Sequence, residues 1–137
     1  MLLEFLHAES PYDEGNERTR GLTAKGKADA EKITKLLISE GIEVIISSPY
    51  SRAVLSVEGL ARHLNLEIHT YEDLRERHFA TKFYEDLMSN IKKNFNNPEY
   101  ALPGGESNAD CQNRSVAILK SIIKEHKGKK IAIGTHG

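Results

Sequence analysis

The amino-acid sequence predicts an α/β fold, a three-layer sandwich in which a largely parallel sheet is covered by helices on both faces. Short apolar runs alternate with longer helical patterns along the chain. One of these runs, Val44–Ile46, is β-branched at every position, which is typical of a strand buried on both faces. Alternating strands and helices form right-handed crossovers, and such connections make neighbouring strands parallel.

The first strand and the first helix follow from apolar spacing and turn residues. Leu2–Leu6 is a strand candidate, and the polar residues 8–21 form a long loop. Thr23 is placed to cap a helix that ends near Gly41. The apolar face of this helix comprises Ala30, Ile33, Leu36 and Leu37.

A second helix is expected directly after the Val44–Ile46 strand. Ser48-Pro49 would begin it, because the missing N–H of a proline has no partner in the first helical turn. Its apolar positions are Ala53, Val57, Leu60, Ala61 and Leu64. Leu66–His69 then indicates a weaker strand.

The C-terminal part of the chain predicts an irregular region, a third helix and a last strand. Residues 73–100 indicate a helical excursion with loops. Ser107, followed by Asp110, resembles a capping box, and the helix that it starts ends near Gly128. The apolar stripe of this helix is Val116, Leu119 and Ile123. Ile131–Ile133 is the last strand candidate.

Length and composition indicate one globular domain spanning residues 1–137. Of the 137 residues, 39% are hydrophobic and 28% are charged, and the formal net charge of −1 argues against nucleic-acid binding. The single cysteine, Cys111, excludes an intrachain disulfide and fits a reducing cytoplasm. Apolar runs are too short to cross a membrane, and no signal peptide is apparent. We therefore expect a cytoplasmic protein without a membrane or nucleic-acid partner.

Residues with useful chemistry follow three of the predicted strands. His7 follows the first, the segment Ser47–Arg52 follows the second, and Thr135-His136-Gly137 follows the last. Because ligands bind at the carboxyl ends of parallel strands, we expect these side chains to converge. An imidazole can be a nucleophile or a proton carrier, and a guanidinium suits two-pronged binding of phosphate oxygens. The sequence therefore predicts phosphoryl chemistry, and it offers no convincing metal cluster.

Short motifs occur in a characteristic order along the chain. They are His7-Ala8-Glu9-Ser10, Ser47-Ser48-Pro49-Tyr50-Ser51-Arg52-Ala53, Leu74-Arg75-Glu76-Arg77, Pro103-Gly104-Gly105-Glu106-Ser107 and His136-Gly137. In this order and spacing they resemble the histidine phosphatase superfamily, which includes cofactor-dependent phosphoglycerate mutases and broad-specificity phosphatases. The resemblance covers essentially the whole chain.

The resemblance implies a mechanism and a role for each of four residues. His7 would be the nucleophile and would form a phosphohistidine. Arg52 and His136 would hold the non-bridging phosphate oxygens and their developing charge. Glu76 would be the general acid that protonates the leaving oxygen. This scheme needs a small phosphorylated substrate and requires neither a metal nor a cofactor.

One departure from the family pattern concerns the residue before His7. The family places an arginine there, whereas this chain has Leu6. Loss of one charged hydrogen bond, about 1.5–3 kcal/mol, would weaken phosphate binding roughly ten- to a hundredfold. Arg18 and Arg20, in the loop that follows, are candidates to compensate for the missing arginine.

Three functions follow from the resemblance. The first is a phosphatase that hydrolyses phosphate monoesters of small metabolites. The second, suggested by Leu6, is a weak or inactive member that binds phosphorylated ligands or partner proteins. The third is a phosphoglycerate-mutase-type phosphotransferase, which the short segment 76–105 disfavours because mutases of the family carry a longer insert there. The loop residues Glu9, Ser10 and Asp13 either contact the substrate or only shape the loop.

The resemblance also predicts that residues 1–137 form an incomplete domain. Family members continue for some tens of residues and add a strand and a helix beside the histidine that corresponds to His136. We expect either a truncated chain or a homodimer in which a second copy covers the sheet.

Overall fold

The computed structural model describes residues 2–11, 16–79 and 87–136. Its sheet has four strands, all paired in parallel in the order β1-β4-β2-β3. The strands are β1 (Leu2–Leu6), β2 (Val44–Ser47), β3 (Ile68–Thr70) and β4 (Lys130–Gly134). The helices are α1 (Ala24–Leu37), α2 (Ser51–Leu64), α3 (Leu87–Asn96) and α4 (Asn108–Glu125), with the short 3₁₀ helix η1 (Glu72–Leu74) after β3.

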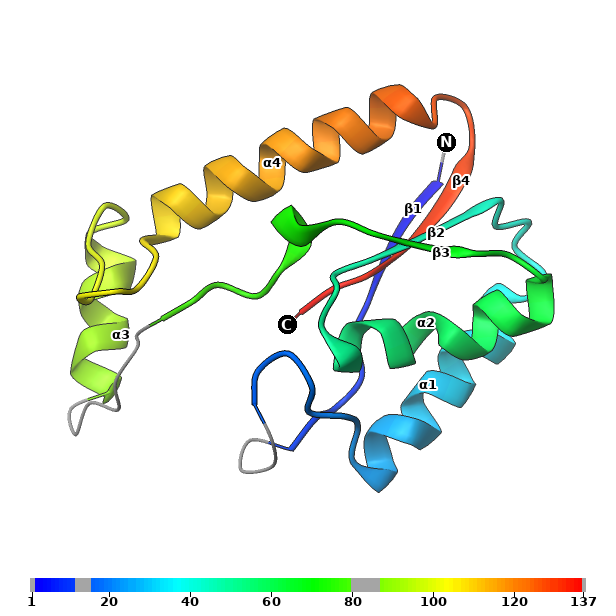
Figure 1. The fold of residues 1–137 in the computed structure, drawn as a ribbon, viewed down its shortest axis with the longest axis horizontal. Coiled ribbons are helices and arrows are strands. Elements are labelled where there is room, and N and C mark those ends of the chain that lie inside the picture. The colour runs from blue at the N-terminus through cyan, green and yellow to red at the C-terminus, as the bar shows by residue number, and fades with distance from the viewer. Residues whose placement is uncertain (1, 12–15, 80–86, 137) are drawn as a thin grey trace.

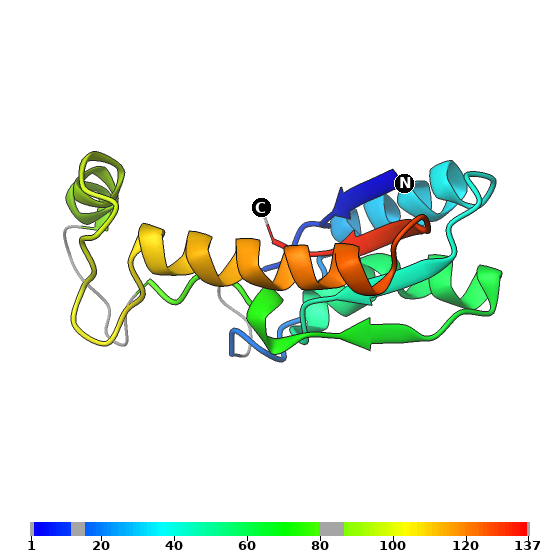
Figure 2. The ribbon, with the colours of Figure 1, turned by 90° about the horizontal axis from the view of Figure 1, so that it is seen from above.

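Helices cover both faces of the sheet, as predicted. Figure 1 shows α1 and α2 on one side and α4 on the other, and the view from above shows the same layers (Figure 2). Ile45 of β2 packs into the core beneath α1 and α2, whereas Val44 and Ile46 pack into the core beneath α4. All four residues of β2 are buried, which confirms a central strand.

The predicted helix starts are confirmed in two cases and wrong in one. The hydroxyl of Thr23 accepts the N–H of Gly26, and the hydroxyl of Ser107 accepts the N–H of Asp110, so both residues are N-caps. The second helix begins at Ser51 and not at Ser48-Pro49. Its N-cap, Tyr50, is extended, and the Tyr50 N–H bonds to the side chain of Ser48, so the chain makes a turn before the helix can start.

Two apolar positions that were predicted to face the core are exposed instead. Leu36 is 71% exposed and Val116 is 41% exposed, so both assignments were wrong. Leu36 precedes the buried Leu37 and is rotated by about 100° around the helix, which turns it towards solvent. In α4 the buried residue is Ile122, flanked by Ile118 and Leu119, so the apolar stripe is shifted from the predicted one.

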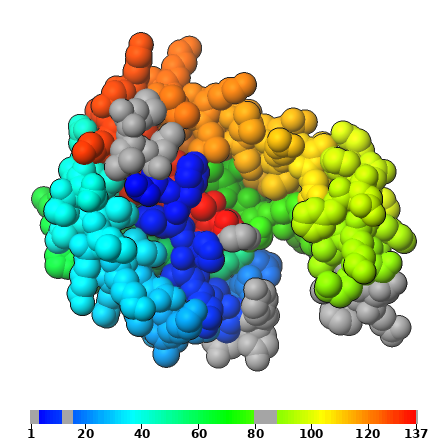
Figure 3. All heavy atoms as spheres, turned by 180° about the vertical axis from the view of Figure 1, so that it is seen from behind, coloured from blue at the N-terminus to red at the C-terminus, as the bar shows by residue number. Residues whose placement is uncertain are grey.

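The region between α2 and α4 is less regular than the rest of the described chain. The weaker strand lies at Ile68–Thr70, two residues later than Leu66 suggested. Within the predicted excursion the structure has η1 and α3, and residues 80–86 lie outside the described part. Figures 1 and 2 show α3 beyond the N-terminal end of α4, away from the sheet. The space-filling view shows α3 standing apart from α1, with β1 visible at the edge of the sheet (Figure 3).

None of the described helices is long and apolar enough to cross a membrane.

Candidate active site

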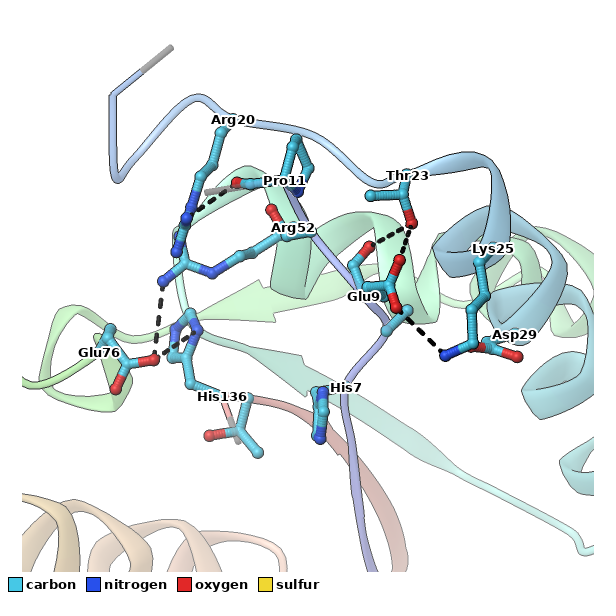
Figure 4. A pocket seen from close by; sticks show the side chains of 13 residues that line it. His7, Glu9, Pro11, Arg20, Thr23, Lys25, Asp29, Arg52, Glu76 and His136 are labelled. Carbon is cyan, nitrogen blue, oxygen red and sulfur yellow. Dashed lines mark hydrogen bonds and ion pairs between the residues drawn. The ribbon is translucent and has the colours of Figure 1, made fainter. Parts of the chain in front are cut away.

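A pocket of about 760 Å³ opens at the carboxyl ends of the strands. His7, Arg52 and His136, which were singled out because they follow strands, line it together with Glu76, which only the family resemblance had indicated. They come from four separate parts of the sequence, and the close-up shows Arg52, Glu76 and His136 pointing towards one another with His7 nearby (Figure 4). The predicted convergence is therefore confirmed.

His7 and His136 follow neighbouring parallel strands. Leu6 of β1 pairs with Gly134 of β4, and the N–H of Thr135 donates to the carbonyl of Leu6 at 2.9 Å. The N–H of Ala8 donates to the hydroxyl of Ser56 on α2 at 3.0 Å. These bonds hold the backbone on either side of His7, while its own side chain stays exposed to a ligand.

The loop after His7 is fastened to the start of α1. The carbonyl of Glu9 accepts the N–H of Thr23 at 3.1 Å, and the Glu9 carboxylate bonds to the Thr23 hydroxyl and the Lys25 ammonium. A Cβ on Gly26 would lie 2.0 Å from the Glu9 carbonyl oxygen, so this close approach requires glycine. Glu9 and Ser10 line the pocket, and Asp13 lies outside the described residues.

Arg52 lies in the first turn of α2, and its side chain is only 7% exposed. Its Nη2 lies 3.1 Å from Oε2 of Glu17 and 3.7 Å from Oε2 of Glu76. The guanidinium also packs over the ring of Tyr50. Burial and these partners fix the cation at the pocket wall, where it can meet an anionic ligand.

His136 is held on two sides. Its Nε2 lies 2.9 Å from the hydroxyl of Ser48, and its ring packs edge-to-face on Tyr50 at a centroid distance of 5.3 Å. Its Nδ1 lies 3.6 Å from Oε2 of Glu76. Burial, reinforced by the charges of Arg52, Arg20 and His7, lowers the pKa of His136 to about 4. The imidazole is therefore neutral at pH 7, and its contact with Glu76 is not an ion pair.

The two loop arginines that were candidates to replace the missing arginine behave differently. Arg20 lines the pocket, and its guanidinium bonds to the carbonyl of Pro11 and contacts Glu17. Arg18 is half-exposed, pairs with Glu72 and does not line the pocket. Leu6 is also absent from the lining and packs against the core beneath α1 and α2.

The ion pair between Arg114 and Glu106, outside the pocket lining, holds the loop that carries Glu76. Arg114 of α4 binds both carboxylate oxygens of Glu106 at 2.8 Å, and its Nη1 donates to the carbonyls of Asp73 and Arg75. Arg114 holds the pKa of the Glu106 carboxyl below its usual value. The N–H of Glu106 donates to the carbonyl of His78. The backbone is thus fixed on both sides of Glu76.

Some residues of the pocket were not anticipated from the sequence. Glu17, Lys25 and Asp29 carry charge at or beside the pocket, yet their sequence context is that of ordinary loop and helix residues. The only signal that could have found Glu17 is its place in the long loop after His7. The described residues include no group of histidine, cysteine, aspartate and glutamate side chains that could hold a metal ion.

Comparisons with known proteins agree on one family. The model of the histidine phosphatase superfamily, branch 1, matches residues 7–137. Phosphoserine phosphatase 1 of Hydrogenobacter thermophilus is 27% identical over 143 residues, covering 95% of this chain and 67% of that protein. Phosphoglycerate mutase-like protein 4 of Arabidopsis thaliana is 30% identical over 127 residues, covering 85% of this chain and 55% of that protein.

Solved structures share the fold. YhfR of Bacillus stearothermophilus superposes with a TM-score of 0.82 at 27% identity, covering 98% of this chain and 73% of that chain. A mycobacterial glucosyl-3-phosphoglycerate phosphatase superposes with a TM-score of 0.81 at 18% identity, covering 98% of this chain and 72% of that chain. The present chain thus spans 55% to 67% of the two curated relatives and about three-quarters of these structures. From the family match over residues 7–137, the chain belongs to the histidine phosphatase superfamily, branch 1.

Proposed function

We propose that the protein is a phosphatase that hydrolyses phosphate monoesters of small metabolites through a phosphohistidine at His7. The observation that carries this proposal is the meeting of two histidines, a buried arginine and a glutamate in one pocket. Each of the four comes from a different part of the chain. Their chemistry matches the needs of phosphoryl transfer, which are a nucleophile, cations or donors for the phosphate oxygens, and a proton source.

The reaction runs in two steps. A ring nitrogen of His7 attacks phosphorus, an N–P bond forms, and the bond from phosphorus to the ester oxygen breaks. Glu76, a carboxylate in the free protein and protonated beside the anionic substrate in the complex, gives its proton to the leaving oxygen, so that an alcohol departs. Water then attacks phosphorus, the N–P bond breaks, and the proton of the water returns to Glu76. His7 and Glu76 end in their starting states, and inorganic phosphate leaves.

Arg52, His136 and Arg20 bind the phosphoryl oxygens in this proposal. Arg52 and Arg20 have side chains only 7% and 10% exposed, so their charges are poorly screened by water. His136 contributes a neutral donor. Arg20 supplies the second guanidinium that Leu6 does not, which supports an active enzyme in spite of the departure at position 6.

The relatives support a small phosphorylated metabolite as the substrate class. One curated relative is named for phosphoserine and one solved structure for glucosyl-3-phosphoglycerate. A pocket of about 760 Å³ has room for a small phosphate ester. The charged side chains of Glu9, Lys25 and Asp29 lie on the side of the pocket away from Glu76 and would face the non-phosphate part of the substrate (Figure 4).

Leu6 favours one alternative, a member of the family that binds phosphorylated ligands with little or no turnover. Without a guanidinium at this position the pocket would still bind phosphate through Arg52 and Arg20. Hydrolysis of an aryl phosphate separates the two functions, because a binding protein would bind inorganic phosphate and leave the ester intact.

The test compares aryl phosphate hydrolysis by the protein, by His7→Ala and by His63→Ala. His63 is an exposed histidine of α2 outside the pocket lining and serves as the matched control. We expect turnover by the protein and by His63→Ala, and a loss of at least about a thousandfold in His7→Ala, as for removal of a nucleophile. Turnover that His7→Ala leaves unchanged would overturn the proposal.

A further inference from the structure

Ser48 is a buried serine that touches the pocket only through His136. Its side chain has no exposed surface, and it does not line the pocket. Its hydroxyl oxygen lies 2.9 Å from Nε2 of His136 and also accepts the N–H of Tyr50 at 3.3 Å. Ser48 lies in the turn between β2 and α2, where its N–H donates to the carbonyl of Gly134 and its hydroxyl accepts the N–H of Tyr50.

One hydrogen-bond acceptor is available to the hydroxyl proton of Ser48 among the described residues. The oxygen already accepts from Tyr50, and the neighbouring hydroxyl of Ser47 donates elsewhere, to the Ser48 carbonyl. Within the described part of the chain, Nε2 of His136 is the acceptor in reach of the Ser48 hydroxyl. A buried hydroxyl proton without an acceptor is costly, so the hydroxyl donates and Nε2 accepts.

This direction decides where His136 carries its proton. A neutral imidazole has one N–H, and the pKa of about 4 keeps the ring neutral at pH 7. If Nε2 accepts, the proton is on Nδ1. That atom is buried, faces Glu76 across 3.6 Å, and has no hydrogen-bond partner among the residues that the structure describes.

An N–H at Nδ1 suits this position better than a lone pair would. Among the described residues, the charged group in contact with Nδ1 is the carboxylate of Glu76, whose Oε2 lies 3.6 Å away. A lone pair at Nδ1 would face one negative oxygen in the free protein and a phosphate oxygen in the complex. An N–H at the same atom is attracted to both.

We infer that Ser48 is a positioning residue that holds His136 in the Nδ1–H tautomer, so that this N–H donates to a non-bridging phosphate oxygen. The role of the phosphate rests on the proposed function, whereas the tautomer does not. Ser48 would act as the partner that selects which ring nitrogen carries the proton, without itself touching the substrate.

The tautomer can be measured directly in the unmodified protein. Long-range proton–nitrogen NMR spectra of ¹⁵N-histidine-labelled protein at pH 7 separate protonated from unprotonated ring nitrogens, and the spectrum of His136→Gln identifies the signals of His136. We expect a protonated Nδ1 and an unprotonated Nε2. The reverse assignment would overturn the inference whether or not the protein is a phosphatase.

Substitutions then test whether Ser48 selects the tautomer of His136. Ser48→Ala removes the donor, Ser48→Thr keeps it, and Ser47→Ala removes a neighbouring buried hydroxyl that does not touch His136. We expect Ser48→Ala to show both tautomers and to bind inorganic phosphate about tenfold more weakly, the worth of about one hydrogen bond. Ser48→Thr and Ser47→Ala should keep the Nδ1–H tautomer and bind phosphate within about threefold of the unmodified protein.

Two outcomes distinguish this inference from the proposed function. A folded Ser48→Ala protein that keeps a single Nδ1–H tautomer would overturn the role of Ser48, even if its phosphate binding were weakened. An unmodified protein with the Nδ1–H tautomer but no affinity for inorganic phosphate would contradict the proposed function and confirm the part of the inference that concerns the tautomer.

Discussion

The carboxylate of Glu17 lies 3.1 Å from the guanidinium of Arg52 and 3.3 Å from that of Arg20. One acidic side chain thus contacts both guanidinium groups that line the pocket. An entering phosphate needs the same N–H groups. Glu17 is 58% exposed, so its attraction to the arginines is screened by water and can be exchanged for a ligand.

Glu17→Gln should bind inorganic phosphate or vanadate more tightly than the unmodified protein. The substitution removes a competing negative charge, and for a half-exposed pair the gain is below about 1 kcal/mol, or up to about fivefold in affinity. The gain in affinity is measured by the inhibition of aryl phosphate hydrolysis by vanadate. Glu31→Gln, which changes an exposed carboxylate of α1 outside the pocket lining, is the control. Weaker inhibition of Glu17→Gln would show that Glu17 positions the arginines rather than competing with the ligand.

Leu6→Arg should leave kcat/KM within about threefold of that of the unmodified protein. Arg20 already supplies a second guanidinium in the pocket, and the Leu6 side chain packs against the core beneath α1 and α2 and does not line the pocket. Leu6→Met, which has a long but uncharged side chain, controls for the loss of leucine packing against the core. A rise of about tenfold or more, the effect of one added charged hydrogen bond of about 1.5–3 kcal/mol, would contradict the role given to Arg20.

Arg114→Met should lower the free energy of unfolding by roughly 2–4 kcal/mol. The Arg114 and Glu106 side chains are 10% and 15% exposed, so the substitution leaves a largely buried carboxylate and two backbone carbonyls without their donor. Denaturant unfolding measures the loss. Arg62→Met, at an exposed pair with Glu58 on α2, should cost less than about 1 kcal/mol. Equal effects of the two substitutions would contradict the argument.

His136 should make the protein less stable as the pH falls from 7 to 4. Burial, with the charges of Arg52, Arg20 and His7, lowers its pKa from 6.5 to about 4, so between these values the unfolded chain binds a proton that the folded chain does not. The loss of stability begins as the pH falls through 6.5 and is complete near pH 4. It amounts to on the order of 3 kcal/mol at most. His136→Gln, which cannot take up the proton, should lose less stability over this range in denaturant unfolding. An identical loss would contradict the lowered pKa.

The layers of the fold could be predicted because they depend on local spacing. The β-branched run of β2 and the caps at Thr23 and Ser107 are signals within a few residues, and the structure confirms them. Leu36 and Val116 could not be placed, because which side of a helix meets the sheet depends on how the helix packs. The start of α2 at Ser51 depends on the bond between Tyr50 and Ser48, which apolar spacing does not encode.

The convergence of His7, Arg52 and His136 was predictable because all three follow strands of one parallel sheet. Glu76 joined them only through the family resemblance. The contacts of Glu17 with Arg52, and of Arg114 with the loop that carries Glu76, join residues dozens of positions apart on different elements. Such pairs are set by the tertiary arrangement, and no spacing along the chain predicts them.

The central claim is that His7 carries the phosphoryl group during turnover. Rapid mixing with an aryl phosphate, an alkaline denaturing quench and mass spectrometry of the peptide that contains His7 tests it directly. We predict a phosphoryl group on His7 that is stable in base and lost in acid, and none in His7→Ala. Turnover without a phosphoryl group on His7 at any time, or with one on another residue, would contradict the account.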